Sequence, residues 1–174
     1  MFKNKKIILA SILFIASLKA FCGVVDHDRM YQAYLTNDMS VWKTELQKYT
    51  ASTDLTITDK LEISNYLYGY IATLLTDADK NKQEIIGWIE LWEKYLEEIE
   101  KATGKNAYVH VYRSSINAYK SKVKAGGMMV WGPRSLTELK RALAIDPNNP
   151  LANGLKGNML FYMPGFVGGD KEES

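Results

Sequence analysis

The sequence has few of the residues that carry catalytic or redox chemistry. Cys22 is the only cysteine, and His27 and His110 are the only histidines, in a chain of 174 residues. The two histidines fall in different predicted helices, and neither has a serine or cysteine motif beside it. A single cysteine also excludes an intramolecular disulfide framework. We therefore expect a protein that is not an enzyme and that uses no cofactor.

Strand patterns and phosphate-binding loops are also missing from the sequence. No segment alternates apolar and polar residues as a half-buried strand does. The glycine pairs at 126–127 and 168–169 follow no strand, so they predict helix ends and not a nucleotide site. His27 lies between Asp26 and Asp28, but adjacent residues on a helix point in different directions, so we expect no metal site there.

The one long apolar run lies close to the N-terminus. It spans residues 7–18, follows Lys3, Lys5 and Lys6, and is too short to cross a bilayer comfortably. This pattern is typical of a secretory signal peptide. We place the signal at 1–22, with cleavage after Ala20 or Gly23 as alternatives. The protein is then exported, periplasmic or secreted, and has no membrane span after cleavage.

Cys22 raises the separate question of a lipid anchor. A lipoprotein signal has an aliphatic residue three positions before the cysteine and a small residue directly before it. Lys19 and Phe21 occupy these positions, so we do not expect a lipid anchor at Cys22.

The positive charge of the sequence belongs largely to this N-terminal segment. Residues 1–22 contain four lysines and no acid, so their removal changes the formal net charge from +2 to −2. Binding to nucleic acid depends strongly on positive charge, and we expect none.

Helical periodicity runs through the rest of the chain. The clearest apolar stripe consists of Ile85, Ile89, Trp92, Leu96 and Ile99. Short breaks between such segments predict seven or eight helices in one domain, 23–174, with antiparallel neighbours. These breaks lie at 37–38, 50–54, 77–82, 103–105, 126–133 and 146–150.

Helix boundaries near the C-terminus carry specific signals. Ser135 and Glu138 have the spacing of a capping box, which predicts that a helix begins at Ser135. Pro147 ends that helix. Small residues among bulky ones, Ala33, Gly69, Ser114 and Gly157, suggest places where a neighbouring helix approaches closely.

The segment "LKRALAIDPNNPLANGLKGN" (139–158) resembles the join between two tetratricopeptide repeats. Ala142 stands where the second helix of a repeat needs a small residue, Pro147 closes the repeat, and Gly157 takes the close-packing position of the next first helix. "GPRS" (132–135) and "MPGFVGGDKEES" (163–174) resemble a variant of this repeat in exported bacterial proteins. In that variant a loop with proline and glycine enters the next helix at Gly-Gly-Asp. The resemblance is strong over 126–174 and weaker over 55–125, and Asn153 and Lys156 depart from it. It implies an all-α, right-handed solenoid of antiparallel helix pairs.

In that family the first helices line a concave groove, and here they carry many of the eleven tyrosines. The resemblance implies a scaffold that binds a peptide or protein partner in a tyrosine-rich groove. About half of the tyrosines should instead belong to the core. The alternative is a periplasmic protein that handles a small molecule, similar to repeat proteins that accompany transporters. We expect the partner-binding residues to be Tyr66, Tyr70, Tyr112, Tyr119, Asn158 and Tyr162.

The C-terminal end carries apolar residues that would need a cover. Leu151, Leu155, Leu160 and Phe161 lie in the last predicted helix, and only a short polar segment follows "MPGFVGGD". Terminal repeats normally end in a polar capping helix. We therefore expect the sequence to stop inside a repeat and the domain to be incomplete at its C-terminus.

Overall fold

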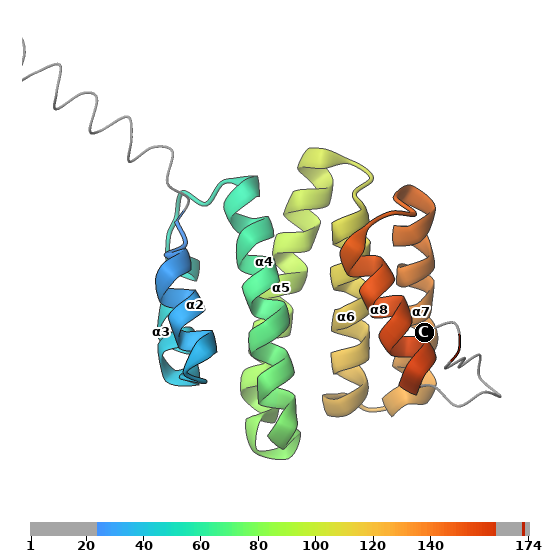
Figure 1. The fold of residues 1–174 in the computed structure, drawn as a ribbon, viewed down its shortest axis with the longest axis horizontal. Helices are drawn as coiled ribbons and strands as arrows, with labels where there is room; N and C mark the ends of the chain where they lie inside the picture. Colours follow the sequence, from blue (N-terminus) through green and yellow to red (C-terminus); the bar gives the residue numbers. More distant parts are fainter. Residues whose placement is uncertain (1–23, 163–171, 173–174) are drawn as a thin grey trace, which may run out of the picture. The chain divides into compact units, whose positions relative to one another are not determined.

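A computed structural model describes residues 24–162 and residue 172. The expected all-α class is confirmed: the described part of the chain is helical and contains no strand (Figure 1). The expected signal peptide and Cys22, like the segment 163–171, lie outside the described residues. No helix among the described residues combines the length and the apolar character that crossing a membrane requires.

The chain divides into two compact units between Ile63 and Ser64. The division falls inside a helix, α4 (Ile57–Leu74). The expectation of one domain over 23–174 stays a prediction. We describe each unit separately.

The N-terminal unit contains α2 (His27–Leu35), α3 (Met39–Thr50) and the first turns of α4. Aspartates begin the first two helices: Asp26 accepts a hydrogen bond from the backbone N–H of Arg29, and Asp38 accepts from those of Ser40 and Val41. α2 packs against α3. The core residues that these two helices bury are Met30, Ala33, Trp42, Leu46 and Tyr49.

The C-terminal unit continues α4 through the short 3-10 helix η1 (Leu75–Asp77) into α5 (Ala78–Thr103). α6 (Ala107–Val123), α7 (Gly127–Ile145) and α8 (Pro150–Tyr162) follow. α6 is the central helix, because it packs against α5, α7 and α8. The apolar stripe expected in α5 is confirmed as core, since all five of its residues are fully buried.

Most helix ends lie where the sequence predicted them. Breaks separate α2 from α3, α3 from α4, α5 from α6, and α7 from α8 at the expected positions. Asn149 caps α8 by accepting from the backbone N–H of Ala152 at 3.0 Å, and Pro150 takes the first helical position, where its missing N–H costs nothing. The break predicted at 77–82 was placed too late, since α5 already begins at Ala78.

The predicted start of α7 at Ser135 was wrong. The helix begins at Gly127, because Gly126 (φ +88°) and Gly127 (φ +49°) adopt left-handed conformations that turn the chain directly after α6. Pro133 lies inside α7 and removes one helical hydrogen bond. The predicted break at 126–133 is therefore too long, since the turn is complete at Gly127.

Ser135 consequently has a different role from a helix cap. Its Oγ donates to the backbone carbonyl of Ser114 at 2.8 Å, and the Oγ of Ser114 donates to the carbonyl of Ser135 at the same distance. Side chains this short can exchange such bonds only where two helix backbones lie close together. The close approach expected at Ser114 is therefore confirmed, between α6 and α7.

Candidate functional site

Tyrosines from α4 and α6 come together in the C-terminal unit. The rings of Tyr68 and Tyr119 stack with their centroids 6.1 Å apart, and the Tyr119 hydroxyl donates to the backbone carbonyl of Tyr68 at 3.0 Å. Trp92 from α5 packs on the buried side, 5.4 Å from the Tyr112 ring and 6.4 Å from that of Tyr119. We call Tyr68, Tyr108, Tyr112 and Tyr119 the tyrosine cluster.

The spacing of these residues in α6 explains their grouping. Tyr108, Tyr112 and Tyr119 are separated by four and seven residues, which places them on one face of a helix. Asn106 fixes the start of α6 by accepting from the backbone N–H of Tyr108 at 2.9 Å. The cluster therefore presents three side chains on one face of α6, with Tyr68 supplied by α4.

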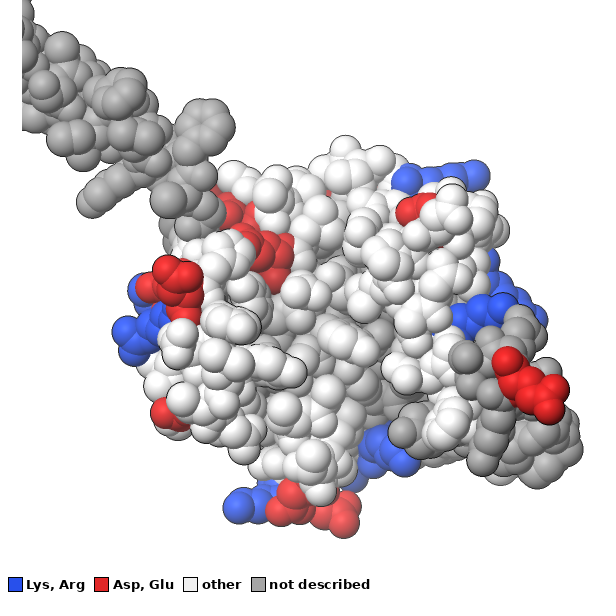
Figure 2. All heavy atoms as spheres, in the orientation of Figure 1, with Lys and Arg blue, Asp and Glu red and all other residues white. Residues whose placement is uncertain are grey.

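Exposure within the cluster is graded. Tyr112 is only 4% exposed, whereas Tyr108 is 42% exposed and Tyr68 and Tyr119 are half-buried. Figure 2 shows that the face over α4 and α8 is largely uncharged. Tyr108 is therefore the ring of the cluster most accessible to a partner, whereas Tyr112 belongs to the core.

Burial affects the titration of two tyrosines of the cluster. It raises the pKa of Tyr112 and of Tyr119 well above the usual value for tyrosine, and the neighbouring Tyr68 hydroxyl adds to both effects. The hydroxyls of Tyr112 and Tyr119 therefore stay protonated and uncharged at neutral pH. Tyrosine suits a binding surface because its ring loses little entropy on binding.

The end of the cluster near Tyr119 is flanked by an ion pair. Lys120 follows Tyr119 in α6 and its Nζ lies 2.6 Å from a carboxylate oxygen of Glu93 in α5. The lysine side chain is 13% exposed and that of Glu93 is 40% exposed. This pair joins α5 to α6 beside the tyrosines and leaves a carboxylate accessible at their border.

The structure brings only part of the expected partner-binding set together. Tyr112 and Tyr119 belong to the cluster. Tyr70 is 2% exposed, and its hydroxyl donates at 2.8 Å to Glu84, whose carboxylate also accepts from the indole of Trp88. Burial of this kind makes Tyr70 a packing residue between α4 and α5, and we no longer assign it to a binding surface.

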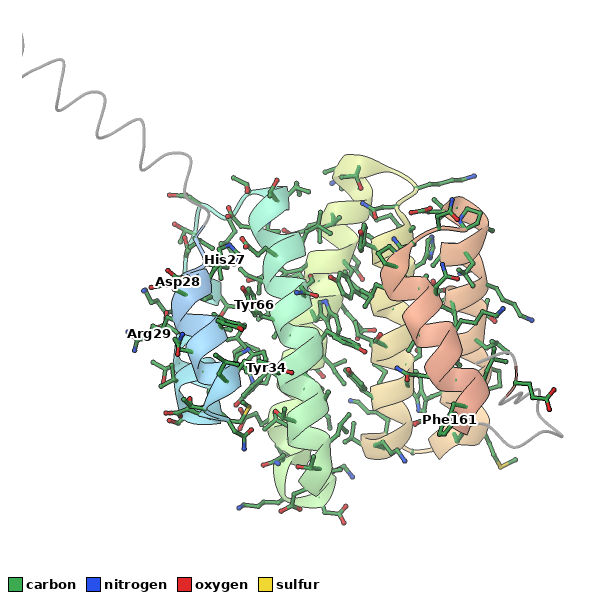
Figure 3. All side chains as sticks on the ribbon, in the orientation of Figure 1. His27, Asp28, Arg29, Tyr34, Tyr66 and Phe161 are labelled. Carbon is green, nitrogen blue, oxygen red and sulfur yellow. The ribbon has the colours of Figure 1, made fainter. Side chains whose placement is uncertain are left out.

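The remaining expected residues lie elsewhere. Tyr66 is half-buried on α4, and because it precedes Tyr68 by two residues it lies on a different face of that helix. Asn158 is exposed on α8. Figure 3 shows Tyr66 well apart from Phe161, which also belongs to α8. The side chain of Tyr162 lies outside the described residues.

Sequence reasoning did not include Tyr68 and Tyr108 in the site. Tyr108 could have been found, since it precedes Tyr112 by four residues on the same helix face. Tyr68 carried no such signal, because its stacking partner Tyr119 is 51 residues away.

A network of charged residues lies in α5, α6 and α7. Arg113 holds Glu100 with two hydrogen bonds of 3.0 and 2.7 Å, and these lower the pKa of the Glu100 carboxyl. Glu138 of α7 contacts His110 Nδ1 and Arg141, each at 2.6 Å. These bonds tie α5 to α6 and α6 to α7. His110 is thus engaged in helix packing.

The described residues were compared with metal sites, and the chain was compared with known proteins. Within the part of the chain that the structure describes, no group of three or more histidine, cysteine, aspartate and glutamate side chains is placed to hold a metal ion. Searches of the chain against protein-family models, curated proteins and solved structures found no match. The site is therefore interpreted from its own chemistry.

Proposed function

We propose that the chain is an exported, tetratricopeptide-like scaffold whose tyrosine cluster binds a peptide or protein segment. Export is supported by the lysines and the apolar run of residues 1–22. The repeat relationship is supported by the segment 139–158 and by the succession of packed helices. Neither catalysis nor a cofactor is part of the proposal.

The observation that carries the proposal is the pairing of Tyr68 and Tyr119 across two helices. A ring stacked on a second ring, with its hydroxyl bonded to backbone, is already held in one orientation before a partner arrives. Preorganised tyrosines are typical binding hot spots, where truncation costs about 2 kcal/mol or more of binding free energy. Tyr108, at the exposed end, supplies a first point of contact.

Site-specific cross-linking tests the proposal. A photoreactive amino acid replaces Tyr108, and in a matched control it replaces Tyr31, which is 58% exposed on α2. Envelope extract is irradiated with each protein, and the cross-linked segment is sequenced and synthesised. We expect one segment that is captured from position 108 and not from position 31. Equal capture from both positions, or a captured segment without measurable affinity for the protein, would refute the proposal.

A small molecule is the second candidate ligand, and one observation favours it. The indole Nε1 of Trp92 is buried beside Tyr112 and Tyr119 and has no hydrogen-bond acceptor among the described residues. A buried donor without an acceptor is costly, and a polar atom of a ligand could satisfy it. This alternative predicts that a small solute, and no peptide, quenches the fluorescence of Trp92.

A further inference from the structure

The first turn of α7 exposes an unusual concentration of apolar side chains. Met128 is 61% exposed, Met129 is 90% exposed and Val130 is 41% exposed, and they directly follow the two glycines of the turn after α6. We call these three residues the apolar tip. Met129 buries almost none of its side chain in this chain, so it contributes little to its folding.

Trp131 supports the tip. Its indole N–H donates to the backbone carbonyl of Ala125 at 3.0 Å, which ties the helix back to the turn. Lys120 Nζ lies 5.1 Å from the ring centroid and the guanidinium carbon of Arg134 lies 4.8 Å from it. These cation–π contacts gather positive charge around the tip and hold the ring in place.

The part of the chain that contains the tip carries charge of one sign over a long segment, although carboxylates of α5 lie beside two of its lysines. Residues 101–137 contain seven lysines and arginines and no aspartate or glutamate. Lys120 is paired with Glu93, and Lys124 lies 4.0 Å from Glu90. Lys122 and Arg134 have no carboxylate partner among the described residues. Figure 2 shows positive side chains at the end of the C-terminal unit where Figure 1 draws the turn between α6 and α7.

We infer that the apolar tip docks on a membrane surface that contains anionic phospholipids. The exposed methionine and valine side chains enter the boundary between headgroups and acyl chains, and lysine and arginine bind the phosphates around them. An acidic protein would satisfy the charges, but it would leave unexplained why three apolar side chains, Met128, Met129 and Val130, are exposed between them. The tip is distinct from the tyrosine cluster, so the scaffold can hold a partner while it lies on the membrane.

A fluorescent probe at the tip tests this inference in the full chain. The probe is attached to Met129→Cys in a Cys22→Ser background, and in a matched control to Ile145→Cys at the other end of the same helix, where Ile145 is 38% exposed. Brominated phospholipids quench a probe that reaches the acyl chains. Vesicles contain either equal parts of phosphatidylglycerol and phosphatidylcholine or phosphatidylcholine alone. Both labelled proteins contain residues 1–22, so attachment through that segment would affect both probes. A difference in quenching between positions 129 and 145 therefore reports immersion of the tip itself.

We expect brominated phosphatidylglycerol vesicles to quench the probe at position 129 at least about three times more strongly than the probe at position 145. Lys122→Gln and Arg134→Gln should each lower the ratio of immersed to free tip about fivefold. Equal quenching at the two positions, or equal quenching by the neutral vesicles, would overturn the inference. So would a probe that responds to polyglutamate and not to vesicles, since that result indicates an acidic protein partner.

Discussion

At the scale of single residues, the role of each tyrosine depends on the side chains that pack around it. Tyr70 and Tyr108 both occupy helices that the resemblance assigns to a binding groove, yet one is 2% exposed and the other 42% exposed. Sequence periodicity identified the helices correctly. It could not show which of the two tyrosines is buried. Burial depends on contacts between helices, such as the hydrogen bond from Tyr70 of α4 to Glu84 of α5.

Substitutions at Tyr70 should therefore affect stability and not binding. Tyr70→Ala leaves a cavity beside Trp88 and should cost about 3–5 kcal/mol of unfolding free energy. Tyr70→Phe keeps the ring and loses the bond to the Glu84 carboxylate, at a cost of about 1.5–3 kcal/mol. Urea denaturation measures both values. A loss below 0.5 kcal/mol for Tyr70→Ala, roughly what a surface position gives, would contradict the buried assignment.

Tyr49 makes the stability of the N-terminal unit dependent on alkaline pH. Burial raises its pKa to about 12 from the usual 10, so the unfolded chain loses this proton before the folded chain does. The stabilisation is complete below pH 10 and declines as the pH rises toward 12. Urea denaturation from pH 9 to pH 12 should show this loss. Tyr49→Phe, which cannot ionise, should show a smaller decline, and identical slopes would contradict the prediction.

At the scale of elements, apolar periodicity predicted the helices and most of their ends. The stripe of α5 is fully buried, and the breaks near 37, 52, 104 and 148 are where the pattern placed them. The start of α7 was not predictable from motifs, because a capping box is recognised by residue type alone. Whether Ser135 caps a helix or bonds to a second helix depends on Ser114, which is 21 residues away.

The reciprocal serine contact should make a measurable contribution to the packing of α6 against α7. Ser135→Ala removes the bond to the Ser114 carbonyl and leaves buried polar groups of Ser114 with fewer partners, at a cost of about 1–3 kcal/mol. Thr137→Ala, at an exposed position of the same helix, is the matched control and should change the free energy of unfolding by less than about 0.5 kcal/mol. Equal effects of the two substitutions in chemical denaturation would show that Ser135 does not join the helices.

At the scale of the whole molecule, stability should differ from helix to helix. α6 packs against three other helices and buries eight residues along its length, whereas α2 packs against α3 and buries two. Local opening is easiest where few apolar contacts must break. Hydrogen exchange should therefore be slowest in α6 and markedly faster in α2. Protection of α2 equal to that of α6 would contradict this distribution of contacts.

The all-α class followed from the sequence alone, because helical periodicity needs no knowledge of distant contacts. The cluster of Tyr68 with Tyr119 did not, since it requires the positions of α4 and α6 in the folded unit. Solenoid geometry and the tetratricopeptide relationship stay predictions that rest on the segment 139–158.

The affinity of the captured segment for the Tyr108→Ala protein tests the central claim most directly. Tyr108 is 42% exposed, so its truncation should leave the midpoint of thermal unfolding within a few degrees of the original. If the tyrosine cluster binds the partner, isothermal titration should show affinity reduced about tenfold or more, and Tyr31→Ala should bind like the unmodified protein. Unchanged affinity for Tyr108→Ala, or an equal loss for Tyr31→Ala, would contradict the claim that this cluster is the binding surface.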